Sequence, residues 1–74
     1  MGLLKVLNGS EEESYSWDPD AQAEVEGARR KFFEYRRQGF VACRISHGGR
    51  EGAPLTEFDP QAEEIFMLGF VDGG

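Results

Sequence analysis

Residues 18–39 of the chain read DPDAQAEVEGARRKFFEYRRQG, and this stretch decides the fold because it predicts a single long helix. Asp18 can accept hydrogen bonds from the free amides at a helix start, and Pro19 suits the first helical position because its missing N–H needs no partner there. Gly39 suits the position just after a helix end, where the backbone often takes a positive φ. We therefore predict a helix over about residues 19–38.

One face of the predicted helix is apolar. At about 100° per residue, a set of side chains falls within about 80° of one another and forms the expected core face. These side chains are Ala21, Val25, Ala28, Phe32 and Tyr35. Acidic residues gather in the first half of the helix and arginines in the second half, which complements the helix dipole at both ends. We expect this helix to pack its apolar face against a sheet.

Two short segments before the helix predict strands. Leu3–Leu7 is an apolar run that stops at Asn8-Gly9, a strong turn signal, and residues 15–17 alternate between aromatic and polar side chains. Between them lies the acidic run Glu11–Glu13, which we expect to form a solvated loop.

Further strands are expected after the helix, at residues 40–45, 55–58 and 65–68. In the first of them Val41, Cys43 and Ile45 share one face, which we expect to be the core face. Asp59-Pro60 repeats the Asp18-Pro19 pair and predicts one helical turn before the last strand.

The first and last strands are apolar on both faces, and such strands usually lie in the middle of a sheet as parallel neighbours. The alternating strands suit outer positions with one face in water. The sequence therefore predicts an α+β fold, in which a mixed sheet of four or five strands packs on one long helix. We assign residues 1–69 to this domain and residues 70–74 to a flexible C-terminal tail.

Composition limits the classes of function. The chain has 74 residues and a formal net charge of −6, which disfavours nucleic acid and anionic membranes as partners. Cys43 is the only cysteine, so we expect no internal disulfide. The sequence contains no signal-peptide or membrane-spanning run, which favours a cytoplasmic protein, and we expect a monomer or a weak homodimer.

The last residues, Asp72-Gly73-Gly74, point to one specific chemistry. Because glycine has no Cβ, a Gly-Gly end can thread a narrow channel and present its carboxylate to an adenylating enzyme. The protein would then be a substrate of enzymes and not itself an enzyme.

The order of elements and the Gly73-Gly74 tail resemble the β-grasp fold of ubiquitin-like proteins, and the resemblance covers essentially the whole chain. The families concerned are ubiquitin-like modifiers and the sulfur carriers of thiamin and molybdopterin synthesis. The resemblance implies that an activating enzyme adenylates the Gly74 carboxylate, which then forms a thiocarboxylate or an isopeptide bond. It also implies that Phe70 belongs to an exposed tail that this enzyme recognises. No arginine stands directly before Gly73-Gly74, and the only lysines are Lys5 and Lys31. Both features favour a sulfur carrier or a divergent bacterial-type modifier.

A second interpretation is a small protein-interaction module with the same fold. Phe33 lies about 120° from the core stripe of the predicted helix, among several arginines. These arginines are Arg29, Arg30, Arg36 and Arg37. A phenylalanine flanked by arginines suits the docking of an acidic partner, and the outer face of the sheet is another candidate surface. Alternatively, the arginines form a solvated helix face and Phe33 folds against a strand edge or loop. Nucleic acid is disfavoured by the net charge.

Reactive and metal-binding groups are sparse. Cys43 and His47 could act as nucleophile and base only if the thiolate were exposed, and we expect Cys43 in the core. One cysteine and one histidine cannot complete a structural zinc site, and Glu11–Glu13 lacks the alternating ligands of a calcium loop. We therefore expect no metal and no cofactor. A third candidate role is an accessory subunit whose acidic surface covers a basic site on a larger protein.

Overall fold

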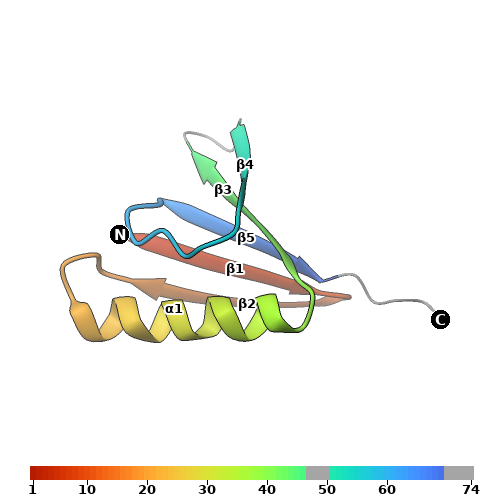
Figure 1. Ribbon diagram of the computed structural model, residues 1–74, viewed down its shortest axis with the longest axis horizontal. Coiled ribbons are helices and arrows are strands. Elements are labelled where there is room, and N and C mark those ends of the chain that lie inside the picture. Colours follow the sequence, from red (N-terminus) through yellow and green to blue (C-terminus); the bar gives the residue numbers. More distant parts are fainter. Residues whose placement is uncertain (47–50, 70–74) are drawn as a thin grey trace.

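The computed structural model describes residues 1–46 and 51–69 of the chain. Along the chain the elements are β1 (Gly2–Asn8), β2 (Glu11–Trp17), α1 (Gln22–Arg37), β3 (Val41–Ser46), β4 (Glu51–Leu55) and β5 (Glu64–Gly69). Figure 1 shows the strands arranged as one sheet, with α1 lying across one of its faces. The predicted tail, residues 70–74, lies outside the described residues, so the predicted domain boundary stays a prediction.

The sheet is mixed, and its strand order is β2-β1-β5-β3-β4. β1 and β5 lie side by side in the middle and run parallel, whereas the other neighbouring pairs are antiparallel. In the central pair, Leu4 lies opposite Ile65 and Val6 lies opposite Met67, and all four side chains are almost completely buried. This confirms the predicted α+β fold and its central parallel pair, in the ubiquitin-like arrangement of a β-grasp sheet and helix.

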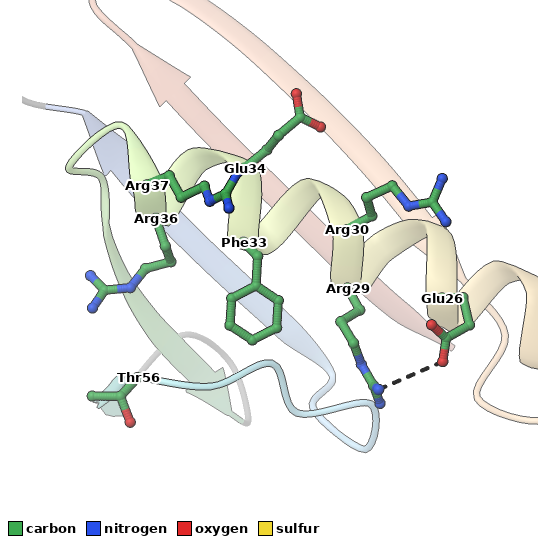
Figure 2. Close-up of a pocket in the computed structure, with 8 residues that line it drawn as sticks. All are labelled: Glu26, Arg29, Arg30, Phe33, Glu34, Arg36, Arg37 and Thr56. Atoms are coloured by element: carbon green, nitrogen blue, oxygen red, sulfur yellow. Dashed lines mark ion pairs between the residues drawn. The ribbon is translucent and has the colours of Figure 1, made fainter.

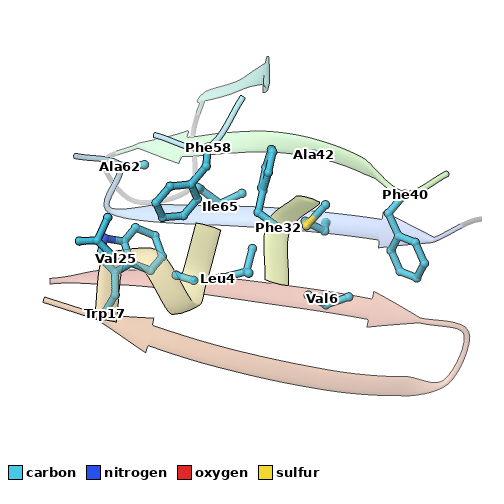
Figure 3. Packing of buried hydrophobic residues seen from close by; sticks show 12 residues of the cluster. Leu4, Val6, Trp17, Val25, Phe32, Phe40, Ala42, Phe58, Ala62 and Ile65 are labelled. Atoms are coloured by element: carbon cyan, nitrogen blue, oxygen red, sulfur yellow. The ribbon is translucent and has the colours of Figure 1, made fainter. Parts of the chain in front are cut away.

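The hydrophobic core lies between the sheet and α1 (Figure 3). From the predicted helical stripe the structure buries Val25, Ala28 and Phe32. Trp17 and Phe58 pack with ring centroids 5.0 Å apart, and Phe58 contacts Phe32 with centroids 5.9 Å apart. The Trp17 indole Nε1 donates a hydrogen bond to the carbonyl oxygen of Pro60 at 3.0 Å, so its polar atom is satisfied. Each large side chain buried in this way contributes about 1.5–3 kcal/mol.

β1 and β2 form a hairpin at the predicted turn. Gly9 has a φ of 64°, and Asn8 pairs with Glu11 directly across the turn. The sequence predicts a loop at Glu11–Glu13, but these residues belong to β2. The short turn is the reason, because it brings them into register with β1, which then pairs with their backbone groups. Because β2 is an edge strand, its exposed glutamates discourage pairing with other chains.

The helix is shorter than predicted at its start and ends where predicted. α1 begins at Gln22, whereas the sequence predicts a start at Pro19. It ends at Arg37, and Gly39 takes a positive φ of 96°, as expected for the residue that turns the chain out of a helix.

Each Asp-Pro pair forms a tight turn and does not start a helix. The Asp18 carboxylate accepts a hydrogen bond from the Asp20 N–H, and the Asp59 carboxylate accepts one from the Gln61 N–H, both at 2.9 Å. In each turn the aspartate carbonyl also accepts a bond from the N–H three residues further on. An aspartate that bonds its local amides in this way competes with helix formation. The predicted helical turn at residues 59–63 is therefore wrong.

The alternation of side chains in β3 also differs from the prediction. Phe40 and Ala42 are buried, whereas Val41 is 43% exposed and Cys43 is half-buried on the opposite face. The predicted core face of this strand is therefore its outer face. Phe40 decides the alternation, because its ring packs on Tyr35 with centroids 4.9 Å apart.

β4 spans Glu51–Leu55, whereas the sequence predicts a strand over residues 55–58. Phe58 turns into the core, where Trp17 and Phe32 contact it. Pro54 is tolerated in β4 because an edge strand can lose one N–H without breaking a bond to its neighbour.

Candidate functional site

A groove runs along the exposed side of α1, where the helix faces the segment that follows β4 (Figure 2). Its volume is about 700 Å³. The groove is lined by Thr56 and by the helix residues Glu26, Arg29, Arg30, Phe33, Glu34, Arg36 and Arg37. We call it the α1 groove.

Phe33 forms the apolar centre of the α1 groove. It follows Phe32 directly, and one step of about 100° around the helix carries the side chain from the core to the groove. Phe32 is completely buried, whereas Phe33 is 43% exposed. The two rings meet edge to face, with centroids 5.4 Å apart and planes at 88°. One side of Phe33 therefore rests on the core, and Figure 2 shows its ring projecting between Arg29 and Arg36.

The arginines share one side of α1 because residues three and four apart are neighbours on a helix surface. Arg36 is held in place by a hydrogen bond from its Nη1 to the carbonyl oxygen of Phe40, at 2.9 Å. The Nη1 of Arg29 lies 3.6 Å from Oε1 of Glu26, and a half-exposed pair of this kind is worth about 0–1 kcal/mol. The arginines are thus positioned mainly by the helix and only weakly by ion pairs.

The α1 groove is basic although the chain is acidic. Four of the 8 lysines and arginines line it together with two glutamates, which leaves a local formal charge of +2. The whole chain carries a formal charge of −6. An acidic partner segment would therefore be attracted to this groove and repelled by most of the remaining surface.

A smaller groove of about 270 Å³ adjoins the α1 groove at Phe33. Its lining consists of Arg29, Phe33, Glu57 and Phe58. Because Glu57 carries a negative charge, this end of the surface is less favourable for a carboxylate than the end near Arg36 and Arg37.

The structure brings together those predicted partner-binding residues that it describes. Arg29, Arg30, Phe33, Arg36 and Arg37 all line the α1 groove. Phe70, Gly73 and Gly74, the other predicted site residues, lie outside the described residues. Sequence reasoning missed Thr56 and Glu57, because these residues reach the helix only through the fold and no local pattern marks them. A binding role for any of these residues stays a prediction.

The sheet face opposite α1 is a second candidate surface. Among the described residues no helix covers it, and it presents Leu3, Leu7, Val41, Cys43, Phe66 and Leu68. Most of these side chains are half-buried, whereas Val41 is 43% exposed. Lys5 on this face lies 3.6 Å from the carboxylate of Glu12. The surface is apolar and close to neutral, which distinguishes it from the basic α1 groove.

A carboxylate joins the edge strand β2 to α1. Oε2 of Glu13 accepts hydrogen bonds from the Tyr35 hydroxyl and from the Tyr15 hydroxyl, the latter at 3.1 Å. The bond from Tyr35, and then that from Tyr15, stabilises the ionised carboxylate and lowers the pKa of Glu13 below its ordinary value of 4.5. The same bond to Glu13 raises the pKa of Tyr35 well above its usual range. This cluster anchors the helix to the sheet.

The reactive groups considered in the sequence are not brought into a site by the described residues. Cys43 is half-buried on the outer sheet face and not in the core as predicted. His47 lies outside the described residues. Within residues 1–46 and 51–69, no group of three His, Cys, Asp or Glu side chains is placed to hold a metal ion. None of the described residues form a helix both long enough and apolar enough to cross a membrane.

Comparisons of the chain with models of known protein families, with curated proteins and with solved structures find no match. The likeness to β-grasp proteins therefore rests on strand order and on the packed helix. The candidate site rests on the geometry and charge of the α1 groove.

Proposed function

We propose that the protein is a small interaction module, not an enzyme, and that it binds a partner protein in the α1 groove. The observation that carries this proposal is Phe33, which stays 43% exposed at the centre of a groove lined by arginines. Aromatic and arginine side chains are enriched among the residues that dominate binding energy at protein interfaces. A partner that covered Phe33 would remove its remaining apolar surface from water, which is favourable.

The expected partner is a protein and neither nucleic acid nor a membrane. The formal net charge of −6 repels phosphate groups over most of the surface, whereas a protein segment needs only the local positive charge of the groove. The proposal places this module in the cytoplasm as a monomer or a weak homodimer.

Site-specific crosslinking in the native host tests the interaction module. A photoreactive benzophenone amino acid replaces either Phe33 or Val41. Both residues are 43% exposed, but Phe33 lies in the α1 groove and Val41 lies on the sheet face opposite α1. Mass spectrometry then identifies the crosslinked peptides after irradiation. We expect one partner segment to be captured reproducibly at position 33 and not at position 41. Capture of the same segment at both positions, or at position 41 alone, would contradict a docking role for the groove.

A second candidate function is a ubiquitin-like carrier or modifier that acts through Gly73 and Gly74. The β-grasp arrangement and the two glycines support it. Gly69, the last described residue, packs so closely on Phe40 that a Cβ would lie 2.5 Å from the ring, and the Phe40 carbonyl binds Arg36. An activating enzyme engaged with the residues after Gly69 would therefore approach the arginine end of the α1 groove.

The carrier function has a separate test. An N-terminally tagged copy from the native host is compared by intact mass and gel mobility with a copy lacking Gly73 and Gly74. Replacement of an oxygen by sulfur at the C-terminus would establish a sulfur carrier, and larger adducts that need the glycines would establish a modifier. An unmodified chain with the same partners in both forms would exclude both roles and leave the interaction module.

A further inference from the structure

We propose that the occupant of the α1 groove is an acidic segment of a partner protein that binds in one direction, an inference that rests on the interaction-module function. An apolar anchor of this segment covers Phe33, and its carboxylates contact Arg36 and Arg37. Toward the C-terminal end of α1 the lining carries Arg36 and Arg37 with one carboxylate, Glu34. Toward the other end the charges of Arg29 and Arg30 are offset by Glu26 and Glu57, and the exposed Phe33 ring lies between. This difference in charge selects the chemistry of the occupant.

The end of the groove near the C-terminus of α1 offers two guanidinium groups, those of Arg36 and Arg37, that are paired with no carboxylate among the described residues. Arg36 has five N–H donors and gives one of them to the Phe40 carbonyl. In the described part of the chain, no carboxylate lies within ion-pair distance of Arg36 or Arg37. Guanidinium groups bind carboxylates through paired, charge-assisted hydrogen bonds. Two adjacent arginines are therefore suited to neighbouring acidic side chains of one segment.

The opposite end of the surface disfavours carboxylates. Arg29 already lies 3.6 Å from the carboxylate of Glu26, and Glu57 lines the smaller groove beside Phe33. An acidic side chain placed there would meet the carboxylates of Glu26 and Glu57, which together offset the charges of Arg29 and Arg30. The asymmetry gives the bound segment its direction, with its acidic part toward Arg36 and Arg37.

Phe33 sets the position of the apolar anchor. Its ring rests edge to face on the buried Phe32 ring, so it cannot fold inward to hide its exposed surface. The adjoining smaller groove is lined in part by Phe58, which is only 8% exposed and adds a little apolar surface next to Phe33. An aromatic or aliphatic side chain of the partner would fit here, immediately before or after its acidic residues.

Strand addition to the neighbouring edge of the sheet is disfavoured as the binding mode. β4 is an edge strand, and Pro54 pairs with Cys43 of β3. Because proline has no N–H, it suits a ladder position whose N–H would point to the open edge. The open edge of β4 therefore lacks a donor that an added strand would need. Side chains of the α1 groove, and not this backbone edge, would carry the recognition.

Peptide binding to the ¹⁵N-labelled full chain tests the proposal. The probes are short synthetic peptides with one tryptophan next to a run of glutamates, in both sequence orders, and matched peptides with glutamines in place of the glutamates. Of the two sequence orders, we expect one glutamate peptide to bind more tightly. That peptide should shift the amide resonances of Phe33, Arg36, Arg37 and Thr56. The matched glutamine peptide should bind at least about tenfold more weakly, because it cannot form charge-assisted pairs.

Substitutions separate local recognition from net charge. Arg37→Ser should weaken binding of the glutamate peptide about tenfold, since it removes one charge-assisted contact. Lys5→Ser changes the net charge equally but lies on the outer sheet face, and it should change the affinity less than about twofold.

Several outcomes would overturn the proposal. They are equal binding of the glutamine peptides, equal losses from Lys5→Ser and Arg37→Ser, and peptide-induced shifts confined to the outer sheet face. Groove resonances that shift on dilution without peptide would identify a second copy of the chain as the occupant. Crosslinking at position 33 to a segment without acidic residues would refute this proposal and leave the interaction-module function standing.

Discussion

Truncation of the two adjacent phenylalanines of α1 should have very different consequences for stability. Phe32 is completely buried and contacts the rings of Phe33 and Phe58, so Phe32→Ala should cost about 3–5 kcal/mol. At about 0.05–0.15 kcal/mol per residue, a domain of this size has a total stability of roughly 4–11 kcal/mol. The substitution should therefore remove a large part of the stability of the fold or abolish it.

Phe33→Ala should cost much less. Because 43% of Phe33 is exposed, a little over half of its surface is removed from water in the folded chain. Full burial of a phenylalanine is worth about 1.5–3 kcal/mol, so the loss should be about 0.9–1.7 kcal/mol. The same variant should lose partner binding, which separates the binding role of Phe33 from the structural role of Phe32.

Urea unfolding followed by the fluorescence of Trp17 measures both effects, since Trp17 is completely buried and becomes exposed on unfolding. The free energies of unfolding are compared at a common slope against denaturant concentration. If Phe32→Ala does not fold, Phe32→Leu retains part of the buried volume and keeps the comparison measurable. Equal losses at positions 32 and 33 would refute the helical orientation on which the groove and its proposed function depend.

Three further substitutions test other parts of the structure. Gly27→Ala should raise the free energy of unfolding by about 0.5–1 kcal/mol, because a Cβ there meets no atom within 4 Å and alanine favours a helix; a lower urea midpoint would contradict this. Gly2→Ala should destabilise the fold by about 1–3 kcal/mol and alter Trp17 emission, because the added Cβ would lie 2.1 Å from the indole; unchanged stability and emission would show that this close packing is wrong. Tyr35→Phe should raise the pKa of Glu13 toward 4.5, as measured by NMR titration of its carboxyl carbon, because the strongest hydrogen bond to the carboxylate is lost. The hydrogen bond that lowers the pKa of Glu13 stabilises the fold above the pKa of the unfolded glutamate, and this stabilisation is lost as the pH falls through the lower pKa of the folded state. The same bond raises the pKa of Tyr35, and the stabilisation that results is fully present below about pH 10. The stability difference between wild type and Tyr35→Phe should therefore be largest between about pH 5 and pH 10, and a pH-independent difference would contradict the hydrogen bond.

The sequence was sufficient where interactions extend over a few residues. The apolar stripe of α1 and its end before Gly39 depend on helical spacing and on one backbone angle. The turn at Gly9 depends on local geometry, and the central position of β1 and β5 follows from apolar side chains on both faces. The same spacing placed Phe33 and the arginines on one side of the helix, so the main residues of the candidate site could be predicted.

Only the tertiary structure decided the features that depend on distant residues. Glu11–Glu13 is a strand because β1 supplies backbone partners, and Phe58 leaves the predicted fourth strand because Trp17 and Phe32 form a pocket for its ring. The alternation of β3 was reversed because Phe40, and not Val41, packs on the core.

The sequence by itself therefore determined an α+β chain with one amphipathic helix, two central strands and a helix face rich in arginine around Phe33. The tertiary structure turned that face into a groove, because the segment after β4 brings Thr56 and Glu57 against α1. Local propensity and periodicity act through neighbouring residues, whereas a groove needs two surfaces that are joined only by long-range packing of the sheet and core.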